Sequence, residues 1–125
     1  MNMTLKQACE EFLEYLKTQN KAERSLYTYG KDLEQIRAFF GEEKELKKIL
    51  IPHVGKFLKS DELLKKKGKD GELLDRAKPT IDKTKRIFRI LMIWTKEQGY
   101  IEHLPLPKEL EVNKGKIKEE EQMKD

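Results

Sequence analysis

Cysteine and long apolar runs are scarce in this sequence, and each scarcity excludes a class of protein. The one cysteine, Cys9, cannot form an intramolecular disulfide, and its isolation favours a reducing compartment such as the cytoplasm. The amino-terminal residues contain no apolar stretch of the length that a signal peptide requires. The longest internal apolar run, residues 90–94, is far shorter than a membrane-spanning helix. We therefore expect a soluble, cytoplasmic protein that does not associate with membranes.

Residues that support catalysis or cofactor binding are equally sparse. The two histidines, His53 and His103, are fifty residues apart, and no cysteine or carboxylate cluster has metal-ligand spacing. Gly68 and Gly71 flank charged residues and open no helix, so a phosphate-binding glycine loop is not indicated. We interpret the tyrosines as surface residues (Tyr15, Tyr27), a core residue (Tyr29) and a helix-cap contact (Tyr100). We expect no metal, no cofactor and no catalytic residue in this chain.

What the sequence does contain is a series of amphipathic helical segments. Hydrophobic residues make up 37% of the 125 residues and recur at helical spacing, which predicts a folded chain despite its 40% charged residues. Thr4 and Gln7 predict a capping box ahead of a first helix that runs to about Asn20. A second helix follows and ends at Gly41.

The second half of the chain contains a third helix and the longest one. Pro52 suits the first turn of the third helix, and residues 60–64 either prolong it or form a short helix of their own. Residues 65–71 are predicted to be a flexible basic loop, and no alternating strand pattern appears in the sequence. The longest helix opens at Pro79 and ends at Gly99, where the following residues fold back as a cap.

These patterns predict an all-α fold, a compact bundle of four to five helices. The domain spans residues 1–107, and residues 108–125 form a linker or a loosely held helix that is mobile from about Lys114 onward. Six large apolar residues should form one continuous core: Leu33, Phe40, Phe57, Phe88, Leu91 and Trp94.

Basic residues outnumber acidic ones by only 27 to 23, but the surplus is local. Residues 65–89 contain ten basic and four acidic residues, a net charge of +6. In the longest helix, Lys85, Arg86 and Arg89 lie opposite the apolar face, and Lys78 precedes them on the same side. Acidic residues four positions away, frequent elsewhere in the chain, are almost absent here. Such a stripe favours contact with a DNA backbone or groove, although a merely solvated face is the alternative.

Three segments also resemble the amino-terminal core-binding domain of tyrosine recombinases (phage integrases). Residues 25–33, Ser-Leu-Tyr-Thr-Tyr-Gly-Lys-Asp-Leu, with the later Phe39-Phe40 pair, are similar to the second helix of that domain. Residues 51–58 are similar to its third helix. Residues 80–101, which begin Thr-Ile-Asp-Lys and end Glu-Gln-Gly-Tyr-Ile, are similar to its fourth helix and the turn after it. The segments occur in the family's order and at its separations, and the resemblance covers about residues 4–107.

The resemblance implies a SAM-like helical domain that forms one half of a C-shaped clamp around a recombination site. The second and fourth helices would face the DNA major groove, with phosphate contacts and limited base reading. The partners would be double-stranded DNA and the catalytic domain of the same parent protein, which would supply the chemistry; the isolated domain would be a monomer. The residues expected to bind DNA are Arg24, Ser25, Lys78, Thr80, Lys83, Lys85, Arg86 and Arg89.

A different function remains open from the residues alone. Ile90 and Ile93 lie towards the polar side of the longest helix, where they contact either the tail and the preceding loop or a partner domain. In the second case the chain would be a helical protein-interaction module with a solvated basic face. A salt-dependent titration with duplex DNA separates the two functions.

Overall fold

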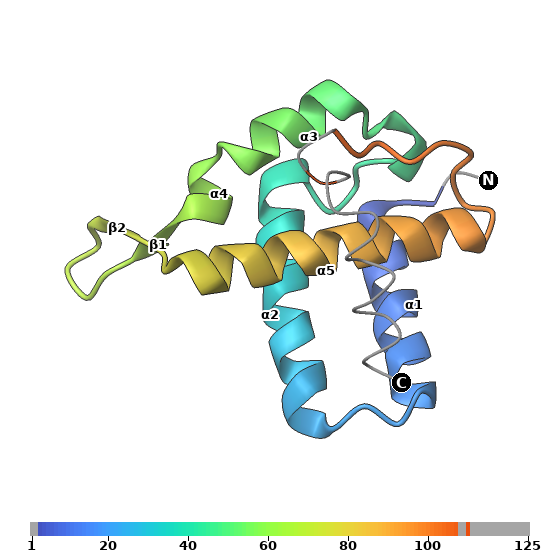
Figure 1. Ribbon diagram of the computed structural model, residues 1–125, viewed down its shortest axis with the longest axis horizontal. Helices are drawn as coiled ribbons and strands as arrows, with labels where there is room; N and C mark the ends of the chain where they lie inside the picture. Colours follow the sequence, from blue (N-terminus) through green and yellow to red (C-terminus); the bar gives the residue numbers. More distant parts are fainter. Residues whose placement is uncertain (1–2, 108–109, 111–125) are drawn as a thin grey trace.

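The computed structural model describes residues 3–107 and residue 110 (Figure 1). These residues form a mostly helical fold, in agreement with the predicted class of four to five helices. The α-helices are α1 (Leu5–Thr18), α2 (Glu23–Phe40), α3 (Ile51–Leu58), α4 (Asp61–Leu64) and α5 (Lys78–Glu97). A 3-10 turn, η1 (Leu46–Lys48), precedes α3, and two strands, β1 (Lys65–Lys67) and β2 (Leu73–Asp75), precede α5.

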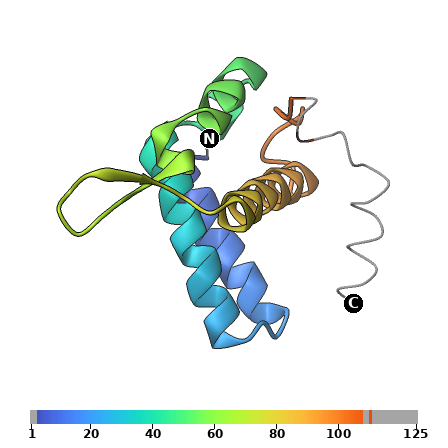
Figure 2. The same cartoon turned by 60° about the vertical axis from the view of Figure 1, so that its left-hand side comes forward.

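Helices α1 and α2 lie side by side, and α5 crosses both of them (Figures 1 and 2). The predicted capping box opens α1: the Gln7 amide N–H donates to Thr4 Oγ1 at 3.2 Å, and the Thr4 N–H donates to Gln7 Oε1 at 2.9 Å. Helix α2 ends at Gly41, whose φ of 95° is a conformation that glycine adopts without strain. The start of α1 and the end of α2 thus follow from local residue chemistry.

The hydrophobic core lies where α5 meets the other helices, and it contains the six predicted residues. Leu33, Phe57, Phe88 and Leu91 are fully buried, and Trp94 is 7% exposed. Phe40 is half-buried and stacks on Phe88 with a ring-centroid distance of 5.7 Å. The burial of Trp94 confirms the predicted apolar face of the longest helix.

Residues 61–64 form a helix of their own, α4, rather than prolonging α3. Ser60 caps it, because its hydroxyl oxygen accepts the Leu63 N–H at 3.3 Å. At the far end of α5, the Tyr100 N–H donates to the Thr95 carbonyl at 2.9 Å, and Gly99 has a φ of 81°. The chain therefore folds back after α5 as its sequence predicts.

The segment that follows Leu64 departs from the sequence-based prediction of a flexible loop over residues 65–71 and of no strand. Strands β1 and β2 instead pair antiparallel, with Lys66 opposite Leu74 and Lys67 opposite Leu73. The Gly68 N–H donates to the Glu72 carbonyl at 2.8 Å and closes the hairpin. Neither strand has a buried face, so the alternation of apolar and polar residues on which strand prediction depends is missing.

The carboxyl-terminal part of the domain packs against the core. Leu106 and Leu110 are both buried, although Leu110 follows the predicted domain boundary at residue 107. The predicted mobility from Lys114 onward falls on residues outside those that the structure describes. Among the residues that are placed, no helix has both the length and the apolar composition needed to cross a bilayer.

Candidate nucleic-acid interface

The predicted basic stripe lies on the face of α5 opposite its buried side chains. The inward face carries Ile87, Phe88 and Leu91, all of which are buried. Helical geometry therefore places Lys85 and Arg86 on the outward side, where both side chains are half-buried. Such side chains cover neighbouring apolar surface with their methylene stems while the charged ends stay near solvent.

Ion pairing divides the α5 cations into two groups. Lys78 Nζ lies 3.2 Å from Asp82 Oδ2, one turn along the helix, and this pair is largely exposed. Within residues 3–107 and 110, no carboxylate lies within ion-pairing distance of Lys85 or Arg86. The Arg86 Nε atom is buried without a hydrogen-bond partner in the same part of the chain. Lys85 and Arg86 thus keep their positive charge available for an anionic ligand.

Lys83, one of the residues expected to bind DNA, forms an ion pair with a buried carboxylate. Its Nζ atom lies 3.2 Å from Oδ2 of Asp32, a carboxylate that is only 3% exposed on α2. The pair joins α2 to α5, two helices that cross one another (Figure 1). Lys83 therefore neutralises a buried carboxylate, which makes it a weaker candidate for DNA contact than Lys85 or Arg86.

Asp32 is the centre of a buried polar network that sequence reasoning missed. The Thr84 hydroxyl donates to Asp32 Oδ1 at 2.6 Å, and Arg76 Nη2 lies 4.0 Å from the same oxygen. Arg76 also donates to Thr84 Oγ1 at 2.9 Å. One signal pointed to this site: Asp32 occupies the inward face of α2 beside Leu33 and Ile36, where a carboxylate requires a partner.

The other predicted site residues are more dispersed. Arg24 and Thr80 are exposed, whereas Ser25 is half-buried in the first turn of α2. Arg24 is eight residues from Asp32, which corresponds to about 12 Å along the helix axis from the crossing with α5. Arg89 is half-buried on the outward side of α5. The structure thus gathers the α5 residues into one surface and leaves the α2 residues at a distance from it.

The four tyrosines differ in their surroundings. Tyr15 and Tyr27 are exposed, and Tyr29 packs against the core. The Tyr100 hydroxyl donates to the Glu11 carboxylate, a hydrogen bond that raises the pKa of Tyr100. A tyrosine with a raised pKa is a poorer nucleophile at neutral pH. Within the described ranges, no group of three or more His, Cys, Asp or Glu side chains has the arrangement of a metal site.

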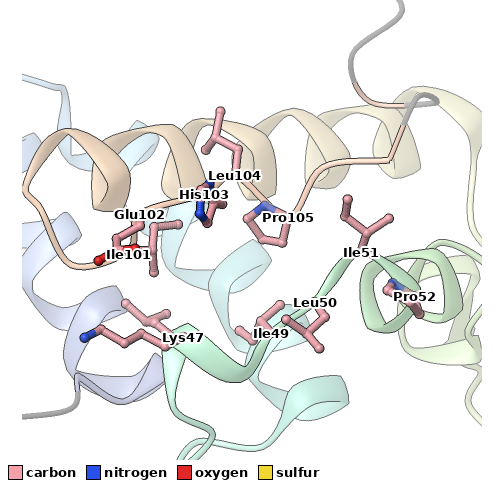
Figure 3. A pocket seen from close by; sticks show the side chains of 11 residues that line it. Lys47, Ile49, Leu50, Ile51, Pro52, Ile101, Glu102, His103, Leu104 and Pro105 are labelled. Atoms are coloured by element: carbon pink, nitrogen blue, oxygen red, sulfur yellow. The ribbon is translucent and has the colours of Figure 1, made fainter.

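A second surface is apolar. A groove of about 500 Å³ separates the segment from Leu46 to Pro52 from the segment from Ile101 to Pro105 (Figure 3). The large apolar side chains of Leu50 and Ile51 are about half exposed at its edge. Another groove, between α1, α2 and α5, contains Ile90 and Ile93, which are half-buried. Partly exposed apolar grooves of this kind are relevant to the alternative function, a helical protein-interaction module.

No family model matches this chain, and neither does any curated protein or solved structure. The resemblance to tyrosine recombinases thus remains a prediction from the three sequence segments. The case for a DNA-binding site rests on the charges and geometry of α5.

Proposed function

We propose that this chain binds double-stranded DNA through the outward face of α5, as the core-binding domain of a tyrosine recombinase. The observation that carries the proposal is the uncompensated charge of Lys85 and Arg86. Both are positioned by a helix whose opposite face is fixed in the core. Cations held in this way neutralise phosphates and release the counterions that condense on DNA.

The dimensions of α5 suit this role. Its 20 residues give an axis of about 30 Å, close to one helical turn of B-DNA at about 34 Å. Lys78, Lys85 and Arg86 are spread over more than two turns of the helix. They can therefore reach phosphates along a groove rather than a single anion.

In this proposal the chain grips DNA and carries out no chemistry. The catalytic domain of the same parent protein, a recombinase acting in the cytoplasm, would supply the reaction and the opposite side of the clamp. When two DNA-binding domains are linked in one chain, binding of the first holds the second near the DNA at a high effective concentration, and the overall affinity rises. The isolated domain should therefore bind DNA as a monomer with the weak affinity of a non-specific complex, about 10⁻⁴ to 10⁻⁶ M.

One observation favours a second candidate function. The exposed Leu50 and Ile51 beside the apolar groove are typical of a surface that contacts another protein. In a protein-interaction module, the α5 cations would only be solvated. The two functions differ in how binding to DNA responds to salt.

The test is a fluorescence-anisotropy titration of a duplex at about 50 mM and about 200 mM salt. We expect Lys85→Ala and Arg86→Ala each to weaken binding. Each should also make the plot of log K against log salt less steep, by about 0.9 for every phosphate that the variant no longer neutralises. Lys17→Ala and Lys59→Ala remove the same charge from exposed sites away from α5. If the α5 variants bind no worse than these controls, α5 does not face DNA and the interaction module becomes the leading function.

A further inference from the structure

The β-hairpin is a projecting, cationic element that the α5 site does not include. Both views show it extending away from the helices, beyond the amino end of α5 (Figures 1 and 2). Its strands pair in the register Lys65 to Asp75, Lys66 to Leu74 and Lys67 to Leu73. The chain runs from β2 through two residues into α5. The hairpin therefore adjoins the end of α5 that carries Lys78.

The base of the hairpin is held firmly against the helices. The Arg76 backbone N–H donates to the Leu64 carbonyl at 2.9 Å, and its guanidinium donates to the Leu63 carbonyl and to Thr84 Oγ1. The Arg76 side chain is only 7% exposed, and Asp32 compensates its charge. These contacts join the hairpin to α4, α5 and α2, so its direction relative to α5 is fixed.

Charge pairing leaves the outer part of the hairpin positive. Lys65 forms an ion pair with Asp75 at the base, which raises the pKa of Lys65 and lowers that of Asp75. The Glu72 carboxylate lies close to Gly68, inside the turn. In the part of the chain that the structure places, the exposed Lys66, Lys67 and Lys69 have no carboxylate partner in an ion pair. Asp70 and Glu72 are the two acidic residues beside them, so residues 66–74 have a net charge of +1.

Two leucines on the hairpin are also unusually exposed. Leu73 is 54% exposed and Leu74 is 42% exposed, and they lie directly across from Lys67 and Lys66. Residues opposite one another in an antiparallel pair project from the same face, so each face combines an apolar side chain with a cation. A surface of this composition fits a DNA groove, where phosphates line the edges and thymine methyl groups lie on the floor.

We propose that the hairpin is a second DNA-binding element that enters the major groove next to the segment covered by α5. This inference rests on the proposed function. A two-stranded ribbon has the width that the major groove admits. Lys66, Lys67 and Lys69 contact the flanking phosphates, while the leucine on the face turned towards the groove floor, either Leu73 or Leu74, packs against base edges. Because each strand has three residues, about 10 Å long, the hairpin adds about three base pairs to the contacted segment.

The test compares three variants of the full chain on the same duplex. The hairpin variant is Lys66→Ala with Lys67→Ala and Lys69→Ala. The control variant removes three exposed lysines elsewhere: Lys17→Ala with Lys56→Ala and Lys59→Ala. We expect the hairpin variant to make the plot of log K against log salt less steep by about 2.7, the sum for three phosphate contacts. The DNA segment that it protects from hydroxyl radicals should be shorter by about three base pairs at one end. The third variant, Leu73→Ser with Leu74→Ser, should weaken binding while leaving the salt slope unchanged.

The possible failures are distinguishable. If the unmodified chain shows no salt-dependent binding, the proposed function itself fails. If the unmodified chain binds and Arg86→Ala weakens it, but the hairpin variant matches its lysine control, the hairpin is not a DNA-binding element. Full affinity in the leucine variant would contradict entry of the ribbon into the groove. Circular dichroism should show native helix content in every variant, because the substituted residues lie outside the core.

Discussion

The pair α1 and α2 and the unit formed by the hairpin and α5 use charge in opposite ways. Residues 5–40 contain six basic and six acidic residues, whereas residues 65–97 contain eleven basic and five acidic ones. Exposed pairs such as Lys17 with Glu14, and Lys31 with Glu34, neutralise the outer faces of α1 and α2. Both regions nevertheless form long helices, α1 and α2 in the first and α5 in the second. Helix formation alone therefore does not explain the surplus of positive charge in the second region.

The two regions are joined by the buried network around Asp32, whose loss should have the largest effect on stability. We expect Asp32→Ala to lower the free energy of unfolding by about 3–5 kcal/mol, because it leaves the Arg76 guanidinium buried without its compensating charge. Chemical denaturation measures the change. Glu34→Ala is the matched control: this exposed carboxylate on the same helix is paired at 3.9 Å, and its loss should cost less than about 1 kcal/mol. Equal costs for the two variants would show that the network is solvated.

A smaller effect should appear at high pH in the balanced region. Burial raises the pKa of the Cys9 thiol from its ordinary value of 9.0 to about 11, against the weaker opposing influence of Arg37. Because the folded chain holds this proton more tightly than the unfolded chain, stability is lost as pH rises from 9 towards 11. The loss should be about 2–3 kcal/mol.

Urea titrations at several pH values measure this dependence. Cys9→Ala is the control, since it removes the thiol but leaves the lysines and tyrosines that titrate in the same range. The difference between the two pH profiles isolates Cys9. Parallel profiles would mean that solvent reaches the thiol in the native state.

Local patterns are sufficient to predict most of the helical framework. The spacing of Leu33, Phe88 and Leu91 identifies the inward faces, and the Thr4 capping box identifies the start of α1. These signals depend on residues within one or two turns of each other. They are readable from a sequence because helix formation and capping are themselves short-range.

The features that sequence reasoning missed depend on contacts between distant segments. Asp32 and Thr84 are 52 positions apart, so their hydrogen bond exists only after α2 and α5 have packed. The ion pair of Lys83 with Asp32 was missed for the same reason, because the two residues lie on different helices. Both faces of the hairpin contact solvent, which removes the burial signal that distinguishes a strand from a loop.

The smallest expected effect on folding belongs to Asp82, the acidic residue within the basic stripe. Asp82→Asn breaks the exposed pair with Lys78 and should change stability by less than about 0.5 kcal/mol, as is usual for an i, i+4 pair. The same change should strengthen DNA binding, because it removes a negative charge that repels phosphate and that competes with phosphate for Lys78. The plot of log K against log salt should become steeper by about 0.9 if Lys78 then neutralises one more phosphate.

Glu14→Gln, which breaks the equivalent exposed pair with Lys17 on α1, is the control and should leave the salt dependence unchanged. If both variants bind DNA alike, net charge alone governs the affinity, and the contrast between the two regions has no bearing on where DNA binds.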